Sequence, residues 1–303
     1  MSDAIRVTVL IENTSDGILA CEHGLSLLIE YAGKRILLDA GSTEAFCENA
    51  DALGIPLTGL DACVLSHGHY DHSGGFGKVF LRDPAAKVYA RQEAFLTYLS
   101  ASGGMHEISV PQQVASHRDR FILVDGFREI LPGIFLVPHH TEGLERIGEK
   151  SGLYKHLDGR IVPDDFAHEQ SLVIDTGYGL VIFNSCSHAG VANIIREAKE
   201  ACGQKQVYAY VGGLHMKGKK DDREICAFSD AEIDALCAVL VQEGVEQIYT
   251  GHCTGTPGFE KLHDRLGNRI HRLTTGMQFE LKFLRNCSRM AVTGSICSEV
   301  SNP

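Results

Sequence analysis

Alternating hydrophobic and polar positions dominate the first forty residues and predict β-strands. Residues 5–11 are β-branched and alternate along the strand period. Two further apolar runs, 25–31 and 34–38, flank the turn Ala32-Gly33, which is typical of a β-hairpin. The chain therefore begins with a small antiparallel unit.

Strands and helices alternate in the rest of the chain. Apolar runs at 169–174 and 180–183, joined by a glycine-rich turn, predict a second hairpin. Ser229 is suited to cap the N-terminus of a following helix. The other expected helices cover 43–53 and 191–202, with 230–243 after Ser229, and the other expected strands cover 60–65, 87–90, 206–211 and 245–249. This order favours a layered α/β fold.

Residues 91–165 have the least regular pattern. They contain Gly103-Gly104, scattered prolines and many charges, with short strands expected at 121–124 and 134–137. We interpret this stretch as an elaboration that walls a substrate pocket, because it has no periodic apolar run long enough for a core of its own. The prediction is one domain over 1–285, with a separate domain at 91–165 as the alternative, and a polar tail over 286–303.

The densest group of reactive side chains lies in residues 66–75, which read SHGHYDHSGG. His67, His69 and His72 stand within six positions together with Asp71. Imidazole and carboxylate at this density suit a divalent first-row metal. The loop follows the apolar run 60–65, so a rigid strand would hold it in place.

Three later histidines share one context. His188, His215 and His252 each follow a strand-like segment within small or glycine-rich residues. A single histidine in such a place is more often structural, but the repeated pattern favours function for all three. Strand ends converge at one edge of a layered sheet, so we expect these imidazoles to meet the first cluster.

The signature at 67–72 resembles the HxHxDH motif of the metallo-β-lactamase superfamily, and the later landmarks fall in that family's order. The resemblance implies a four-layer αββα sandwich with one or two divalent metal ions, zinc foremost, and manganese, iron or magnesium as alternatives. It assigns His67 and His69 to metal one and Asp71 and His72 to metal two. His252 would complete metal two, and His188 would complete metal one.

One position departs from the family pattern. Many members carry a bridging Asp at the end of the second hairpin, where this chain has Ser185-Cys186-Ser187. Cys186 could be a thiolate ligand, a residue behind the ligands or inert packing, and a second metal without the bridge could be weak or absent. His139 and His140 rank below His188 as the family's middle histidine, and we expect them to be solvated or to contact substrate.

Further residues are expected to support the centre. Asp39, in the run Leu-Leu-Asp-Ala-Gly, resembles an aspartate that steadies the metal loop from behind, with a turn or helix cap as the alternative. Thr254 is expected behind the ligands or in the pocket, where it and Gly255 would offer backbone N–H groups to an anion if they open a helix. His168 and Glu169 are expected at the surface, with a salt-bridging or pocket role as the alternative, and Glu169 is the one of the two kept as a candidate for support of the site. The catalytic residues are predicted to be Asp71 and His215, the latter as a proton shuttle or phosphate contact.

The segments SHGHYDHSGG, EQSLVI, CSHAG, GGLHM and HCTG together resemble one branch of the superfamily, that of the dihydropterin–ribofuranosylaminobenzene phosphate synthases and related metal-dependent hydrolases. The resemblance implies an enzyme that joins a dihydropterin-methyl diphosphate to an aryl amine ribose phosphate and releases pyrophosphate. The first alternative is hydrolysis of an ester, thioester or phosphodiester. The second is a di-iron redox or sensing protein, whose relatives carry Glu where Gly68 or Tyr70 stands here.

Composition and charge limit the classes of partner that we expect this protein to bind. A net charge of −11 over 303 residues argues against a general nucleic-acid surface. No apolar run reaches the roughly 18 residues that span a bilayer, and no leader-like start is present, so we expect a cytoplasmic protein with a small, phosphorylated substrate. The ten cysteines lack CxxC pairs and suit a reducing compartment. The lysines at 217, 219 and 220 favour a solvated loop, with anion contact as the alternative.

Overall fold

Two seven-stranded sheets form the centre of the computed structural model, which describes residues 4–283. The first sheet has the order β20 (Gln278–Lys282), β1 (Ala4–Ile11), β2 (Ser26–Tyr31), β3 (Lys34–Leu38), β4 (Ala62–Val64), β5 (Val88–Arg91) and β8 (Phe121–Val124). The second has the order β19 (Ile270–Arg272), β18 (Gln247–Thr250), β15 (Val207–Val211), β14 (Leu180–Phe183), β13 (Gln170–Asp175), β10 (Ile134–Pro138) and β9 (Arg128–Leu131).

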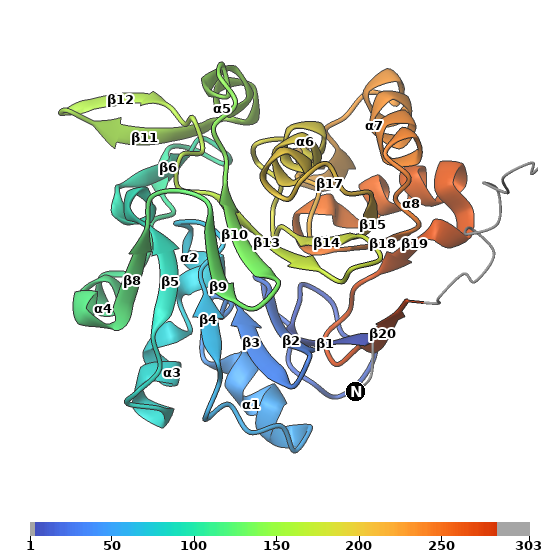
Figure 1. Ribbon diagram of the computed structural model, residues 1–303. Coiled ribbons are helices and arrows are strands. Elements are labelled where there is room, and N and C mark those ends of the chain that lie inside the picture. The colour runs from blue at the N-terminus through green and yellow to red at the C-terminus, as the bar shows by residue number, and fades with distance from the viewer. Residues whose placement is uncertain (1–3, 284–303) are drawn as a thin grey trace, which may run out of the picture.

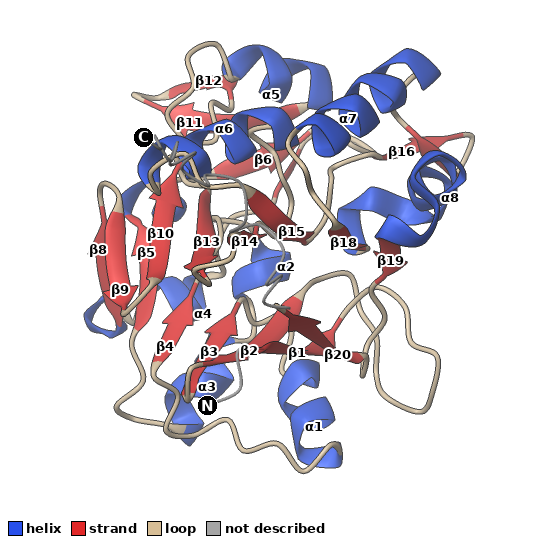
Figure 2. Cartoon of the chain, turned by 45° about the vertical axis from the view of Figure 1, so that its right-hand side comes forward, coloured by secondary structure: helices blue, strands red, loops and turns tan. Residues whose placement is uncertain are grey.

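Helices cover the outer faces of both sheets. The first sheet is covered by α1 (Ala45–Ala52), α3 (Phe76–Arg82) and the short α4 (Gln112–Ala115), and the second by α6 (Val191–Ala201), α7 (Asp230–Gln242) and α8 (Gly255–Leu266). Figure 1 shows α1 and α3 below the first sheet and α6 to α8 beside the second. In the turned view of Figure 2 the strands again lie between these two groups of helices. The predicted αββα sandwich is confirmed.

Buried side chains form three apolar layers, one between the two sheets and one between each sheet and its helices. Val7, Leu27 and Leu172 belong to a buried cluster between the sheets. The opposite face of the first sheet packs on Phe46 of α1 and Phe76 of α3. Because both faces of each sheet are buried, the central strands are almost continuously apolar.

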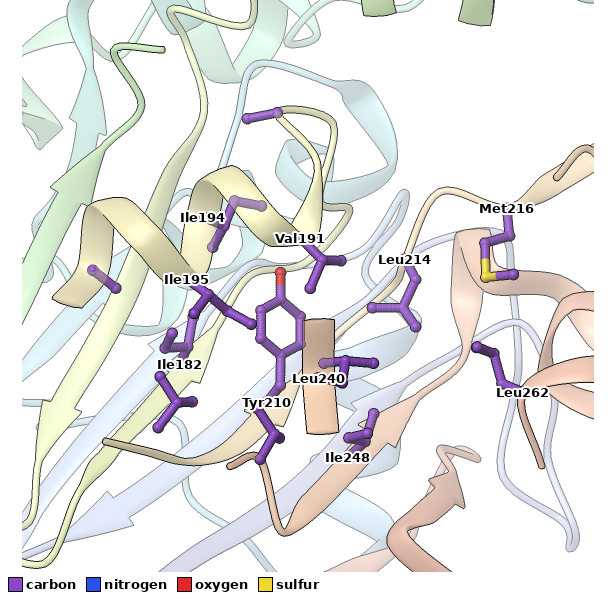
Figure 3. Packing of buried hydrophobic residues seen from close by; sticks show 14 of the residues in the cluster. Ile182, Val191, Ile194, Ile195, Tyr210, Leu214, Met216, Leu240, Ile248 and Leu262 are labelled. Carbon is purple, nitrogen blue, oxygen red and sulfur yellow. The ribbon is translucent and has the colours of Figure 1, made fainter. Parts of the chain in front are cut away.

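The third layer joins the second sheet to its helices and reaches the functional loops. In Figure 3 the Tyr210 ring lies among Ile195, Val191 and Leu240, with its hydroxyl directed toward α6. That hydroxyl lies 2.8 Å from Ser187 Oγ. The buried tyrosine thus fixes the loop that follows β14.

Local signals in the sequence are confirmed at two places. Ala32 and Gly33 both have positive φ, 51° and 77°, in the tight turn between β2 and β3. Ser229 accepts a hydrogen bond from Glu232 N, and the Glu232 carboxylate accepts one from Ser229 N in return. This reciprocal cap starts α7 at the predicted residue.

Residues 91–165 are not a single elaboration of the fold, as the sequence suggested. β8, β9 and β10 lie in this stretch but are strands of the two main sheets. A separate four-stranded sheet is formed by β6 (Tyr98–Ser100), β7 (His106–Glu107), β11 (Leu153–Leu157) and β12 (Arg160–Pro163), beside α5 (Glu145–Ser151). The main-sheet strands are only four or five residues long, so their pairing partners, and not their own pattern, decide where they belong.

The remaining expectations concern the lysine cluster, membrane spans, the cysteines and the C-terminal tail. The lysines at 217, 219 and 220 lie on β16 (Lys217–Lys220), which forms a hairpin with β17 (Arg223–Cys226), so the predicted loop is wrong, whereas their predicted exposure to solvent is confirmed. None of the helices between residues 4 and 283 is long and apolar enough to cross a membrane. The eight cysteines of this range are free thiols. The predicted polar tail lies outside the described residues.

Candidate metal centre

The signature loop runs from the end of β4 into the short helix α2 (Tyr70–Ser73) and packs very closely on its neighbours. A Cβ atom at Gly74 would overlap the carbonyl oxygen of Ser42, and one at Gly75 would overlap that of Ala40. Only glycine permits this approach, which explains why the histidine cluster ends in Ser-Gly-Gly.

His67, His69 and His188 form the first group of donors. One ring nitrogen from each lies within 4.8 Å of the others, and all three side chains are buried. His188 Nε2 lies 3.3 Å from His67 Nε2, although the two residues are 121 positions apart. The structure therefore brings together the three imidazoles predicted for metal one.

Hydrogen bonds identify the free nitrogen of His67. Ser66 Oγ donates to Asp39 at 2.6 Å, so it accepts from His67 Nδ1 at 2.8 Å, and the Nε2 of neutral His67 carries a lone pair and no proton. His69 Nε2 has no hydrogen-bond partner. Burial lowers the pKa of all three histidines, that of His69 to about 3, so they are neutral at pH 7. Neutral imidazole is the form that binds metal.

Asp71, His72 and His252 form the second group. His72 Nε2 lies 3.2 Å from His252 Nε2, and the Asp71 carboxylate lies 3.6 and 3.4 Å from these two nitrogens. Asp39 accepts from His72 Nδ1 at 2.7 Å, and Asn13 Oδ1 accepts from His252 Nδ1 at 2.9 Å. With Nδ1 as the donor in each ring, both Nε2 atoms are hydrogen-bond acceptors, and they face each other. This arrangement is unfavourable unless a proton or a cation lies between them.

A proton fills this role when no cation is bound. Burial disfavours the charged form of His72, but the carboxylates of Asp71 and Asp39 outweigh it and raise its pKa to about 9. Cation binding at this group is therefore expected to release a proton at neutral pH. The two donor sets fit the nitrogen and oxygen ligands of zinc and related divalent ions.

Asp39 lies behind both groups and is hydrogen-bonded toward each of them. Its carboxylate accepts from Ser66 N at 2.7 Å, from Ser66 Oγ and from His72 Nδ1. The alternative of a helix cap is wrong, because Glu44 occupies the N-cap of α1. The buried Asp39 instead orients one histidine of each group.

We expect Asp39→Asn to lower metal affinity by about 10–100-fold, because an amide cannot accept all three hydrogen bonds. The measurement is competition with a chromophoric chelator. Asp125→Asn, at an exposed position, is the control. Equal affinities in both variants would contradict the supporting role.

His23 is a site residue that the sequence reasoning missed. Its Nε2 lies 3.2 Å from Asp71 Oδ2, and its ring stacks on that of His252 at 5.0 Å. It comes from the loop between β1 and β2, in the unremarkable context Cys-Glu-His-Gly. No local motif marks this residue, and only the fold brings it to Asp71.

The surface prediction for His168 and Glu169 is wrong, since both are fully buried. His168 Nδ1 accepts from Gly68 N and its Nε2 donates to Asp164, each at 2.9 Å. The two carboxylate oxygens of Glu169 accept from the backbone N–H groups of His188 and Ala189, both at 2.9 Å. These two residues hold the two histidine loops from behind, and neither lines the cavity over the site.

His139 and His140 do not join the metal cluster. The His139 ring is buried and donates to Glu197 at 2.7 Å, which contradicts the solvated loop, whereas the His140 ring is exposed. Burial opposes the charge of Glu197, but hydrogen bonds from His139, Thr141 and His140 N outweigh it and lower its pKa to about 2. α6 supplies this carboxylate, so the burial of His139 depends on a distant helix.

The low pKa of Glu197 predicts a pH-dependent contribution to stability. A carboxylate with a depressed pKa stabilises the folded state above its unfolded pKa, about 4.5, and this contribution declines as pH falls toward 2. Glu197→Gln should lower the free energy of unfolding by about 3 kcal/mol at neutral pH and flatten its decline below pH 4.5. Denaturant titrations over a pH series measure this, with the exposed Glu200→Gln as control. A parallel shift at every pH would contradict it.

Thr254 is buried but does not provide an open anion site. Its Oγ1 accepts from Leu214 N at 2.9 Å, which ties the His215 loop to the His252 loop. The N-terminus of α8 follows, and the Glu224 carboxylate already accepts from Thr256 N at 2.7 Å. The Thr254 N–H itself donates to Gly251 O at 2.9 Å, so this group is not free for an anion as the sequence suggested.

A cavity of about 1040 Å³ opens above the two donor groups. His69, Asp71, His188 and His252 line it, and His215 lies beside them with its ring centroid 4.3 Å from that of His188. His215 Nδ1 has no hydrogen-bond partner. Another hollow, of about 860 Å³ along the β1–β20 edge, is lined by no histidine or cysteine. The candidate ligands that reach a cavity therefore lie at the first of the two.

Known proteins resemble this chain in sequence and structure. Residues 19–149 match the metallo-β-lactamase superfamily. The chain is 30% identical over 270 residues to the 7,8-dihydropterin-6-methyl-4-(β-D-ribofuranosyl)-aminobenzene-5′-phosphate synthase of Methanocaldococcus jannaschii, which covers 84% of this chain and 88% of that protein. It is 37% identical over 117 residues, 39% of each chain, to a hydroxyacylglutathione hydrolase of Serratia proteamaculans. The crystal structure of Tm1679, a metal-dependent hydrolase of the β-lactamase superfamily, shares 26% identity and a TM-score of 0.76, covering 92% of this chain and all of that one.

The αββα layers, the two donor groups at their edge and these similarities define the class: the chain belongs to the metallo-β-lactamase superfamily. Within the superfamily it resembles the branch of the dihydropterin–ribofuranosylaminobenzene phosphate synthases. The fold is thus established, and the role of each donor as a ligand stays a prediction.

Proposed function

We propose that this chain is a metal-dependent enzyme that transfers a dihydropterin-methyl group from its diphosphate to an aryl amine ribose phosphate. The observation that carries the proposal is the convergence of six buried donors, of which His69, Asp71, His188 and His252 line one large cavity. The proposed ligands are His67, His69 and His188 for one ion and Asp71, His72 and His252 for the other. The similarity to the archaeal synthase supports this reaction in particular.

The protein residues would create the conditions for metal binding. Burial keeps the first three imidazoles neutral, and Asp39 and Asn13 fix the orientation of His72 and His252. Divalent ions held there would offset the negative charge of a diphosphate leaving group.

The walls of the cavity suit a substrate with a flat ring and phosphate groups. Apolar side chains from α5, β11 and α7, including Ile147, Leu153 and Leu236, form one side. Lys217 and Lys219 lie on another, where their ammonium groups contact Glu224 at 3.4 Å and Asp222 at 2.9 Å. Phosphate groups of a substrate would compete with these carboxylates for the lysines.

His215 is proposed as the catalytic base, with the metal-group carboxylate Asp71 as the second catalytic residue. In the transfer, a C–N bond forms to the amine, the C–O bond to the diphosphate breaks, and pyrophosphate leaves with the electron pair. The amine loses one proton. His215 lines the cavity beside His188, and an imidazole at this position can serve as the acceptor of that proton.

The test is an assay of zinc- or manganese-loaded protein with the pterin diphosphate and the aryl amine. We expect pyrophosphate release that depends on the amine, with the C–N product identified by mass spectrometry. Metal content is measured on the same sample. Fully loaded protein without amine-dependent release would overturn the synthase proposal.

Hydrolysis is the second candidate, and the metal-dependent hydrolase Tm1679 favours it. The same preparation is therefore offered an ester, a thioester and a phosphodiester. Turnover of one of these without C–N bond formation would assign the metal centre to hydrolysis.

A further inference from the structure

Cys186 lies between the two donor groups, in the loop that follows β14. Its side chain is buried, and its Sγ lies 3.3 Å from His72 Nε2. Cys186 Sγ also lies within 4.8 Å of the ring nitrogens of both His67 and His72, one histidine from each group. The sulfur is thus within reach of both metal positions.

The surrounding carboxylates have other partners. Asp39 accepts from Ser66 and His72 on the side away from the cavity. Glu169 uses both oxygens on the backbone of the His188 loop. Asp164 accepts from His168 Nε2 and from Phe166 N. Asp71 lies 3.6 Å from His72 Nε2 but belongs to the second group. Among the described residues, Cys186 is the donor able to carry negative charge that clusters with both His67 and His72.

Cys253 is the competing sulfur, and its position differs. Its Sγ clusters with Cys186 and His252, but not with His67 or His72. It lies close to Gly213, where a Cβ atom would overlap it, and it donates to Cys186 O at 3.5 Å. Cys253 therefore lies on one side of the centre, which makes it a matched control.

We propose that Cys186 Sγ is a metal ligand shared by the two positions, in the place where many relatives carry a bridging carboxylate. This inference rests on the proposed metal centre. The sulfur–metal bonds form as the S–H bond breaks and its proton passes to solvent. A thiolate at this position makes the centre selective for thiophilic ions such as zinc over manganese and magnesium, which prefer oxygen.

Cobalt(II) provides the spectroscopic test. Metal-free protein is titrated with cobalt, and bound cobalt is counted by elemental analysis. We expect a near-ultraviolet sulfur-to-cobalt charge-transfer band in the unmodified protein and in Cys253→Ser, and its loss in Cys186→Ser. Circular dichroism verifies that each variant is folded, and the band in Cys253→Ser tests the proposal even if Cys186→Ser does not fold.

Metal selectivity gives a second readout. Cys186→Ser should weaken zinc binding by at least about tenfold and change manganese binding far less. Stoichiometric cobalt without the band, or a band that Cys253→Ser removes and Cys186→Ser retains, would overturn the sulfur ligand and leave the metal centre standing. Failure of the unmodified protein to bind cobalt, zinc or manganese would instead overturn the metal centre itself.

Discussion

Replacing His188 by alanine should strongly reduce the proposed reaction of the metal-loaded protein and lower the stoichiometry of bound metal. His188 contributes a buried imidazole to the first donor group, with its Nε2 3.3 Å from that of His67. Supporting residues around metal ligands typically change affinity or activity by about 10–100-fold, so removal of a ligand should cost more, on the order of 10³-fold. The measurements are kcat/KM and metal content of the same purified sample.

His140→Ala is the control for this prediction. His140 is the neighbouring candidate for the family's middle histidine, and its side chain is 69% exposed. Its loss should leave both readings within experimental error. If His140→Ala lost metal and His188→Ala kept it, the assignment of the first donor group would be wrong.

Elements whose signals are local were predictable from the sequence. The β2–β3 hairpin requires only two apolar strands and a turn with positive φ, which Ala32-Gly33 provides. The cap of α7 requires only Ser229 and Glu232. The assignment of β8 to the first sheet instead depends on its parallel pairing with β5, more than twenty residues away. No pattern within four residues contains that information.

The candidate site likewise has residues that the sequence predicts and residues that only the fold reveals. The cluster from His67 to His72 is visible in the sequence because its donors are adjacent, and family order pointed to the remaining histidines. Burial was the property that the sequence could not predict. His168 and Glu169 are polar residues at the start of a strand, and they are buried because their partners lie in other loops. His23 likewise reaches Asp71 only in the folded chain.

Close approach of two backbone segments explains the run Gly-Gly-Leu-His at 212–215. Its histidine is the residue that suggests function, but its glycines determine the local geometry. Gly212 has a φ of 138°, and a Cβ there would overlap the carbonyl oxygen of Asn184. The loops after β14 and β15 can therefore touch, and this contact brings His215 to His188.

Glu169→Ala should destabilise the protein strongly. Its buried carboxylate accepts the N–H groups of His188 and Ala189 at 2.9 Å, and it lies 3.6 Å from His139 Nε2. The variant leaves two buried donors unpaired, so the free energy of unfolding should fall by about 3–5 kcal/mol. Denaturant unfolding of the metal-free protein measures this loss without the contribution of bound ions.

Two further variants, Glu169→Gln and the exposed Glu142→Ala, distinguish the loss of these hydrogen bonds from a general effect of replacing a glutamate. Glutamine keeps one oxygen acceptor and turns an NH₂ group toward the other N–H, so its loss should be intermediate. Glu142→Ala should change stability little, because surface substitutions rarely exceed about 0.5 kcal/mol. If Glu169→Ala matched Glu142→Ala, the His188 loop would be held by its other contacts, such as Ser187 Oγ with Tyr210, and the carboxylate would not be needed to place the ligand.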